Sequence, residues 1–372
     1  MSDRLPIRRG VVSVVVSGVA IAGAGGPAIA QTPVPQPGNI VQTSTTTVEV
    51  LGLRRWTIAM LNDSLRKYEG YDLSTAGAHA CAATLRYKLG FADAAAIMLP
   101  GTATTSYWVV TVVEPQDSSR VKYRALPIDT TRGRPEWAEA RRLMQANREV
   151  FGLISGEILA RAVQSRGAAS VLDPAQAQGT PAPASLASPM GDTSSFMRAQ
   201  GALRAWFAAH ASAADYELAL TVVRRDSNML DRILALNVIL SFLDDDRAWT
   251  ALSETLLESD GPVRGTGFQL FRSVVASGKR PKDLAAIFPA LHAVLNGTSQ
   301  VLMPQVVPLI FALRPGEAMA APLLKNGGEM LLAHASARHR TVRDPALALL
   351  AALSPKNYGR DVERWRAWVA SL

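Results

Sequence analysis

Apolar and polar residues follow two kinds of period along the chain, and the change between them marks two folded regions. From residue 48 to residue 165, helical and strand-like periods occur together. A helical stripe covers residues 53–68, and Ser74 or Thr75 is expected to cap a second helix that ends near Gly90. The first region therefore begins with two predicted helices.

Three extended segments follow these helices. They cover residues 94–99, 107–113 and 121–128, and the middle one (YWVVTVV) is rich in β-branched and aromatic residues. A turn at 115–119 (PQDSS) separates the second segment from the third, so antiparallel pairing is the simplest arrangement. We expect three antiparallel strands here.

A long amphipathic helix is predicted from Pro135 to about residue 165. Proline suits the first turn of a helix. The apolar side chains on one side of this helix are Trp137, Ala140, Leu143, Met144, Phe151 and Ile154. The order helix, helix, three strands, helix defines a small α+β domain over residues 48–165.

The region 194–372 shows a helical period throughout. Short Gly-, Pro- or Asp-containing breaks favour antiparallel helix pairs, so the protein is expected to be mainly α. Ten apolar stripes predict helices near 196–211, 214–225, 228–243, 246–258, 262–277, 281–295, 300–313, 317–335, 341–353 and 359–371.

The N-terminal residues have the composition of an export signal. In residues 1–30, three arginines precede an apolar run at 11–24, and Ala-Ile-Ala ends at Ala30, which predicts cleavage before Gln31. The general secretory route and the twin-arginine route both remain open, and the alternative is an uncleaved N-terminal anchor. We expect an exported protein, periplasmic or secreted, with no transmembrane segment after cleavage.

Two segments of low complexity lie next to the folded regions. Residues 31–47 carry Pro, Thr and Gln without a period, and residues 166–193 are rich in Ala, Pro and Ser. Both are predicted to be linkers, the second one disordered.

Composition and charge exclude several classes of function. The chain of 372 residues has a single Cys, which excludes an intramolecular disulfide and a zinc site built on paired cysteines. Its formal charge of +8 is distributed over both regions, whereas a nucleic-acid-binding protein concentrates basic residues on one face. No phosphate-binding loop, dinucleotide motif or HExxH motif occurs, so we expect no cofactor, no metal and no nucleic-acid partner.

A degenerate repeat is visible in the helical region. Val263-Arg264 and Val342-Arg343 each open a predicted helix, the two arginines lie 79 residues apart, and Val301-Leu302 lies near the midpoint without the arginine. A period of about 40 residues with two helices per unit is typical of HEAT and armadillo repeats. These motifs resemble the HEAT repeat over roughly residues 228–372. The closing helix around Trp365 and Trp368 is similar to those of bacterial HEAT-repeat proteins.

This resemblance implies an α-solenoid and structural roles for Arg264 and Arg343. An arginine at the start of a helix lies near the positive end of the helix dipole, and in HEAT-like stacks a carboxylate compensates for it, here Asp260 or Asp344. Two prolines, at 304 and 308, depart from the pattern in the middle unit. The alternative arrangement is an irregular helical bundle.

Few residues suggest chemistry. Cys81 and His79 form the nearest candidate pair for nucleophilic catalysis, but two positions apart on a helix their side chains point in different directions. His334 and His339 miss the spacing of a helical metal pair, and we interpret them as exposed or capping. Asp244-Asp245-Asp246 is interpreted as a helix N-cap.

Three functions remain in view. The leading hypothesis is a non-enzymatic interaction protein that binds another protein or an envelope component through its helical-repeat surface. A hydrolase with Cys81 as the nucleophile and His79 or a distant histidine as the base is the second hypothesis. The third is a small-ligand module with an apolar pocket between the three strands and the helix at 134–165.

Overall fold

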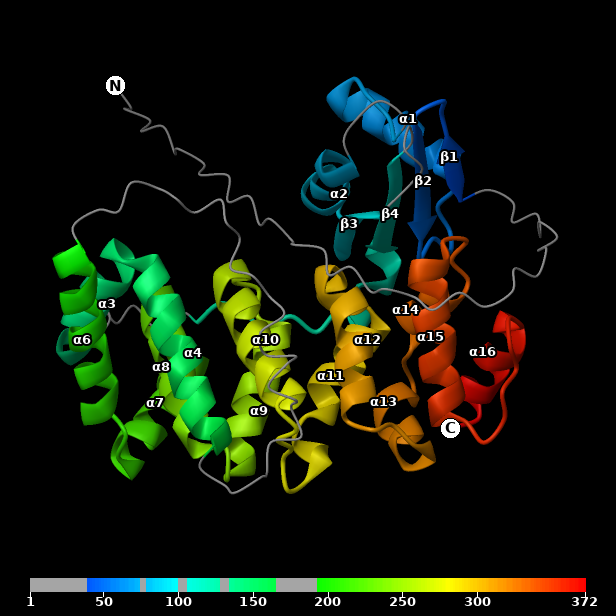
Figure 1. Ribbon diagram of the computed structural model, residues 1–372. Helices are drawn as coiled ribbons and strands as arrows, with labels where there is room; N and C mark the ends of the chain where they lie inside the picture. Colours follow the sequence, from blue (N-terminus) through cyan, green and yellow to red (C-terminus); the bar gives the residue numbers. More distant parts are fainter. Residues whose placement is uncertain (1–38, 74–77, 100–105, 128–133, 165–192) are drawn as a thin grey trace, which may run out of the picture. The chain divides into compact units, whose positions relative to one another are not determined.

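The computed structural model describes residues 39–73, 78–99, 106–127, 134–164 and 193–372. Residues Gly38–Leu372 form one compact unit (Figure 1). The predicted signal peptide, with the cleavage site at Ala30 and Gln31, lies outside the described residues, as do Ser74, Thr75 and residues 166–192 of the predicted second linker.

A four-stranded mixed sheet lies near the N-terminus. Its strands are β1 (Ile40–Gln42), β2 (Thr46–Leu51), β3 (Asp93–Leu99) and β4 (Ser106–Val113), in the order β1-β2-β4-β3. The outer pairs are antiparallel, as predicted for β3 and β4, whereas β2 and β4 are parallel. The expected set of three antiparallel strands is therefore wrong in number and in pairing.

Two differences from the sequence prediction explain this change. The predicted linker 31–47 contains β1 and the start of β2, because the Thr-rich segment pairs with β4 instead of remaining unpaired. The predicted strand 121–128 makes only an isolated bridge, from Arg124 to Glu258. Its backbone bonds to the helical region, where the Lys122 N–H donates to Oγ1 of Thr298 and the Arg124 N–H donates to the Leu257 carbonyl.

Helices cover both faces of the sheet. Helices α1 (Ile58–Glu69) and α2 (Ala78–Tyr87) pack with one face, and the other face contacts α15 (Arg340–Leu353) through Leu51, Val109 and Val342. A strand covered on both faces is buried without alternation. This accounts for the fully buried run at the end of β4, residues 109–113.

The long helix predicted from Pro135 is interrupted. A 3₁₀ turn, Pro135–Trp137, leads into α3 (Ala138–Ala146) and then α4 (Arg148–Gln164), with Asn147 in a non-helical conformation between them. The predicted apolar side is confirmed, since Trp137, Leu143 and Ile154 are buried. However, α3 and α4 pack against helices of the C-terminal region and not against the sheet.

The C-terminal region is helical, as predicted. Its helices are α6 (Thr193–Ala209), α7 (Ala213–Arg225), α8 (Met229–Ile239), α9 (Asp246–Glu254), α10 (Gly261–Ala276), α11 (Phe288–Asn296), α12 (Met303–Ala312), α13 (Ala320–Leu324), α14 (Glu329–Ala335), α15 and α16 (Val362–Ala370). The helix predicted over 317–335 is divided into α13 and α14, because Asn326 and Gly328 adopt positive φ between them. Pro304 occupies the first turn of α12, where its missing N–H costs little.

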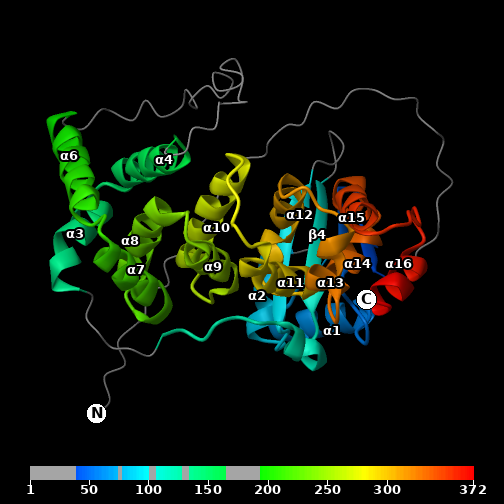
Figure 2. The same ribbon diagram turned by 90° about the horizontal axis from the view of Figure 1, so that it is seen from below.

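Successive helices form pairs that contact the next pair. The pairs are α7–α8, α9–α10, α11–α12 and α14–α15. One helix of each pair belongs to a row α8, α10, α12, α15, and the other to a row α7, α9, α11, α14, as Figure 2 shows. Neighbouring helices therefore bury apolar side chains against one another, and a single hydrophobic core runs through the region.

Within the described residues, no single helix has the length and apolar composition needed to cross a membrane. Residues Phe288–Asn296 and Gln300–Ala312 have this length and composition only when they are taken together, and the chain bends by 100° at the break between the two segments.

Candidate partner-binding surface

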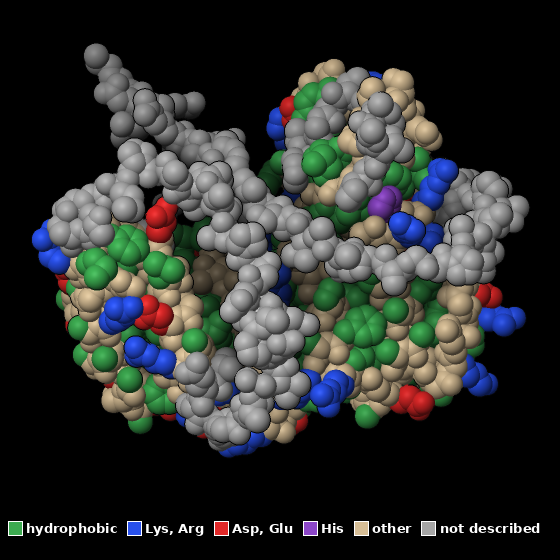
Figure 3. Space-filling view, in the orientation of Figure 1, with side chains coloured by type: hydrophobic (Ala, Val, Ile, Leu, Met, Phe, Trp, Pro, Cys, Tyr) green, Lys and Arg blue, Asp and Glu red, His purple; other side chains and the backbone are tan. Residues whose placement is uncertain are grey.

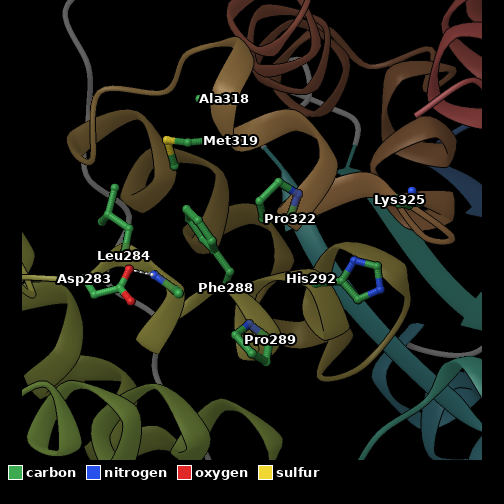
Figure 4. Close-up of a pocket in the computed structure, with 10 residues that line it drawn as sticks. Asp283, Leu284, Phe288, Pro289, His292, Ala318, Met319, Pro322 and Lys325 are labelled. Atoms are coloured by element: carbon green, nitrogen blue, oxygen red, sulfur yellow. Dashed lines mark hydrogen bonds between the residues drawn. The ribbon is translucent and has the colours of Figure 1, made fainter.

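A groove lies between α11, which belongs to the row α7, α9, α11, α14, and the short helix α13. It has a volume of about 580 Å³, and it begins at the 3₁₀ turn Leu284–Ala286 before α11 (Figure 4). The apolar residues that line it are Leu284, Ala285, Phe288, Pro289, Ala318, Met319 and Pro322. Such a surface suits apolar side chains of a partner, and Met319 adds a side chain that adapts easily to different shapes.

Polar contacts fix the entrance of the groove. Both carboxylate oxygens of Asp246, in the first turn of α9, accept hydrogen bonds from the backbone N–H groups of Lys282 and Asp283, at 2.7 and 3.0 Å. The Asp283 carboxylate in turn accepts from the Ala285 N–H at 2.8 Å and caps the 3₁₀ turn. Asp246 of α9 therefore fixes the position of the turn that leads into α11 and the groove.

His292 closes the opposite side of the groove. Its Nδ1 lies 3.0 Å from the Leu323 carbonyl oxygen, so Nδ1 carries the hydrogen that it donates to this carbonyl. The ring packs against Gly327, where a β-carbon would lie 2.3 Å from the imidazole Cε1. Only glycine permits this close approach of α11 to the turn between α13 and α14.

The two ends of the groove carry opposite charges. Asp283 lies at one end and Lys325 at the other, as Figure 4 shows. Among the described residues neither side chain forms an ion pair with an opposite charge. The arrangement is an apolar floor between an anionic and a cationic end.

A second apolar surface lies on the row α8, α10, α12, α15. Exposed side chains of α12 and α15 form it, and Val301 and Phe311 expose 44% and 36% of their surface. Hydrophobic side chains gather over these two helices in Figure 3. The exposed apolar residues of this face are Val301, Pro308, Phe311, Ala312, Pro345 and Ala348.

Cys81 is buried in the core that α1 and α2 form with the sheet. Burial raises the pKa of its thiol to about 11, which suppresses the thiolate that nucleophilic catalysis requires. His79 belongs to the same helix α2, but its side chain lies outside the described residues. The structure shows no hydrogen bond between Cys81 and any described histidine.

The other histidines have structural surroundings. His334 is buried, contrary to the prediction that it is exposed or capping, and burial lowers its pKa to about 4. His339 occupies the N-cap position of α15 and its ring contacts Tyr107, with centroids 4.6 Å apart. His210 stacks on Trp206 at 4.1 Å. Among the described residues no group of three or more His, Cys, Asp or Glu side chains could hold a metal ion.

Asp245 is the N-cap of α9, as the interpretation of the acidic triplet predicted, and it accepts from the Arg247 N–H at 2.9 Å. Asp246 holds the groove entrance instead. The groove residues could not be identified from the sequence, because buried and exposed apolar residues give the same helical period. The only signal near them was the Asp-rich break before α9.

The repeat residues begin helices of one row. Val263 and Arg264 lie in α10, and Val342 and Arg343 lie in α15. Val301 and Leu302 both lie in the 3₁₀ turn Gln300–Leu302, directly before α12. The two arginines have similar partners upstream: Arg264 donates to the Glu258 carbonyl and Arg343 to the Arg338 carbonyl. Val263 and Val342 are buried.

The acidic residues expected near these arginines behave differently. Asp344 pairs with Arg343 at 2.9 Å, within the same helix. Asp260 does not pair with Arg264 but caps α10 by accepting from the Val263 N–H. The Arg264 guanidinium instead lies over the Tyr123 ring, 5.5 Å from its centroid.

Buried carboxylates join the sheet to the helical rows. Oε1 of Glu49 in β2 accepts from the Arg338 N–H at 2.6 Å, at the start of α15. Oδ2 of Asp93 in β3 accepts from the Tyr123 hydroxyl and from the Gln300 N–H. Burial raises the pKa of Asp93, although the nearby Arg86 opposes this shift. These long-range contacts leave no local pattern in the sequence from which they could be predicted.

The pocket expected between the strands and the helix at 134–165 is not formed by these elements, since α3 and α4 pack elsewhere. A smaller pocket of about 240 Å³ lies instead between α4, α6 and α8. Its floor includes Ile154, Phe207 and Val238, and the ion pair between Glu157 and Arg204 lies at its rim.

Comparison of the chain with family models, with curated proteins and with solved structures gave no match.

Proposed function

We propose that this chain is an exported, non-enzymatic interaction protein that binds a segment of another protein through the groove between α11 and α13. The observation that carries this proposal is the groove itself: an open apolar floor between the neighbouring helices α11 and α13, with a charged side chain at each end. A protein of the cell envelope is the partner that the export signal favours.

We further propose that the helix pairs from α7 to α15 form a HEAT-like solenoid. Two features support it: each pair contacts the next along two rows, and the three repeat motifs all lie at the start of helices of the same row. In such arrays partners bind to the continuous surface that one row provides.

The surroundings of Cys81 favour binding over hydrolysis. A buried thiol with a raised pKa is a poor nucleophile at neutral pH. The groove lining contains no Ser, Thr or Cys side chain that could attack a substrate. Among the described side chains no histidine forms a hydrogen bond with Cys81, so the interaction function is the better conclusion.

Site-specific photo-cross-linking tests the proposal. We place p-benzoylphenylalanine at Ala318, an exposed residue of the groove, and at Tyr87, an exposed aromatic residue of α2, as the matched control. The expected result is an adduct from Ala318 alone that maps by mass spectrometry to one recurring segment of a single protein.

A binding measurement then decides whether the adduct reports recognition. The purified partner segment should bind the full chain, and Pro322→Asp should weaken binding at least about tenfold, because a charge on the apolar floor would lose its hydration when the apolar segment covers it. Equal cross-linking from both positions, or unchanged binding by Pro322→Asp, would show that the groove is not the binding site.

A further inference from the structure

We infer that the groove selects partner segments that carry a cationic residue at one end and an anionic residue at the other, with apolar residues between them. This inference rests on the proposed function and specifies the chemistry of the partner. It starts from Asp283 and Lys325, which lie at opposite ends of one apolar floor.

Both charges are available to a ligand. In the part of the chain that the structure describes, neither side chain has an ion-pair partner, and both residues are exposed. The carboxylate of Asp283 uses Oδ1 to accept from the Ala285 N–H, which leaves Oδ2 for a cation.

The apolar floor requires the middle of the segment to be apolar. Phe288, Met319 and Pro322 would contact its side chains, and a charge placed there would lose its hydration without a partner. The end charges contribute little energy on their own, since exposed ion pairs are weak, but they penalise a like charge and so provide specificity.

Four synthetic peptides test the inference by isothermal titration calorimetry with the full chain. All have acetylated and amidated ends and the same apolar spacer of Leu, Phe and Pro, made in several lengths. They differ only in the terminal residues: Lys and Glu, Glu and Lys, Lys and Lys, or Glu and Glu. Both mixed peptides are included because an extended segment can bind in either chain direction.

The mixed peptides should bind about tenfold more tightly than either like-charged peptide at low salt, and the difference should nearly vanish in 1 M salt. Lys325→Glu, which makes both ends anionic, should shift the preference to the Lys–Lys peptide. Asp283→Asn keeps a capping side chain but removes the charge, so it should abolish discrimination against the Glu–Glu peptide.

The control is the double variant Lys282→Glu, Glu317→Lys. It changes exposed charges that adjoin the groove without lining it, and it should leave the order of affinities unchanged. Equal affinities for all four peptides, or no binding by any of them, would overturn the inference. The cross-linking experiment at Ala318 decides the proposed function independently of this result.

Discussion

At the scale of the residue, close packing between the helices depends on positions that cannot carry a side chain. Gly267 in α10 faces Thr255, which is fully buried after α9, and a β-carbon at Gly267 would lie 2.2 Å from Oγ1 of Thr255. Gly265, two residues earlier on the same helix, has no neighbour within 4 Å of such a β-carbon. The two glycines look equivalent in the sequence but have different surroundings.

Gly267→Ala should therefore destabilise the protein by about 1–3 kcal/mol, because α10 must move away from the buried Thr255. Gly265→Ala is the matched control and should stabilise the protein by up to about 1 kcal/mol, since alanine has the higher helix propensity. Urea denaturation measures both changes. Equal effects of the two substitutions would contradict the packing shown here.

Cys81 provides a second test at this scale. Its pKa of about 11, against an ordinary value of 9.0, corresponds to about a hundredfold lower thiolate fraction at neutral pH. Iodoacetamide should therefore label the native protein at least about a hundredfold more slowly than the unfolded protein. Rapid labelling of the native protein, followed by mass spectrometry, would restore the hypothesis of a reactive cysteine.

At the scale of the element, side-chain caps determine where helices begin. Asp245 caps α9, and hydrogen bonds from Arg247 hold its pKa below its ordinary value. A carboxylate with a lowered pKa in the folded state stabilises that state above the pKa of the unfolded chain, and this contribution is lost as the pH falls through the folded value.

Asp245→Ala should lower the free energy of unfolding by about 1 kcal/mol at pH 7, and Asp245→Asn by less, because asparagine still caps a helix. The difference between Asp245→Ala and the wild type should shrink as the pH falls below the ordinary aspartate value of 3.8. Urea unfolding at a series of pH values measures it. A difference that does not depend on pH would show that the charge contributes nothing.

At the scale of the whole molecule, buried polar contacts join the sheet to the helical rows. Glu49 binds the start of α15, and Arg120 donates to the Asn296 carbonyl through Nε and Nη2, at 3.1 and 2.9 Å. Unfolding one part would break these hydrogen bonds and would expose apolar side chains that the two parts bury against each other, such as Leu51 and Val342. The sheet and the helices are therefore expected to unfold together.

Glu49→Gln keeps the size of the side chain but removes its charge. It should lower the free energy of unfolding by about 1.5–3 kcal/mol, because the hydrogen bonds from Tyr107 and Arg338 are then no longer charge-assisted. Two probes follow the transition in denaturant: labelling of Cys81 for the sheet core and far-ultraviolet circular dichroism for the helices. Tyr107→Phe, which removes only the hydroxyl bonded to Glu49, should cost about 1 kcal/mol and is the matched control.

Coincident transitions for the two probes would confirm one cooperative unit. Separate transitions in the wild type, with Cys81 exposed while the helical signal remains, would show that the sheet unfolds by itself.

Local patterns predicted much of the secondary structure. The helical stripes of the C-terminal region, the strands β3 and β4 and the cap at Asp245 were all anticipated, because helix period, β-branched runs and capping residues act over a few neighbours. The prediction was wrong where a distant partner decides the conformation. β2 forms by pairing with β4, and the backbone N–H groups of Lys122 and Arg124 bond to the helical region instead of pairing with a strand.

The sequence by itself determined that this protein is mainly helical, with a small sheet near its N-terminus and a single cysteine in an apolar helix. Only the tertiary structure decided which apolar surfaces remain exposed and that Asp283 and Lys325 lie at the two ends of one groove. It also decided that the buried Glu49 and Asp93 accept hydrogen bonds from residues far along the chain, next to α15 and α12. The reason is physical: period and capping energies are local, whereas burial and charge pairing depend on residues that only folding brings together.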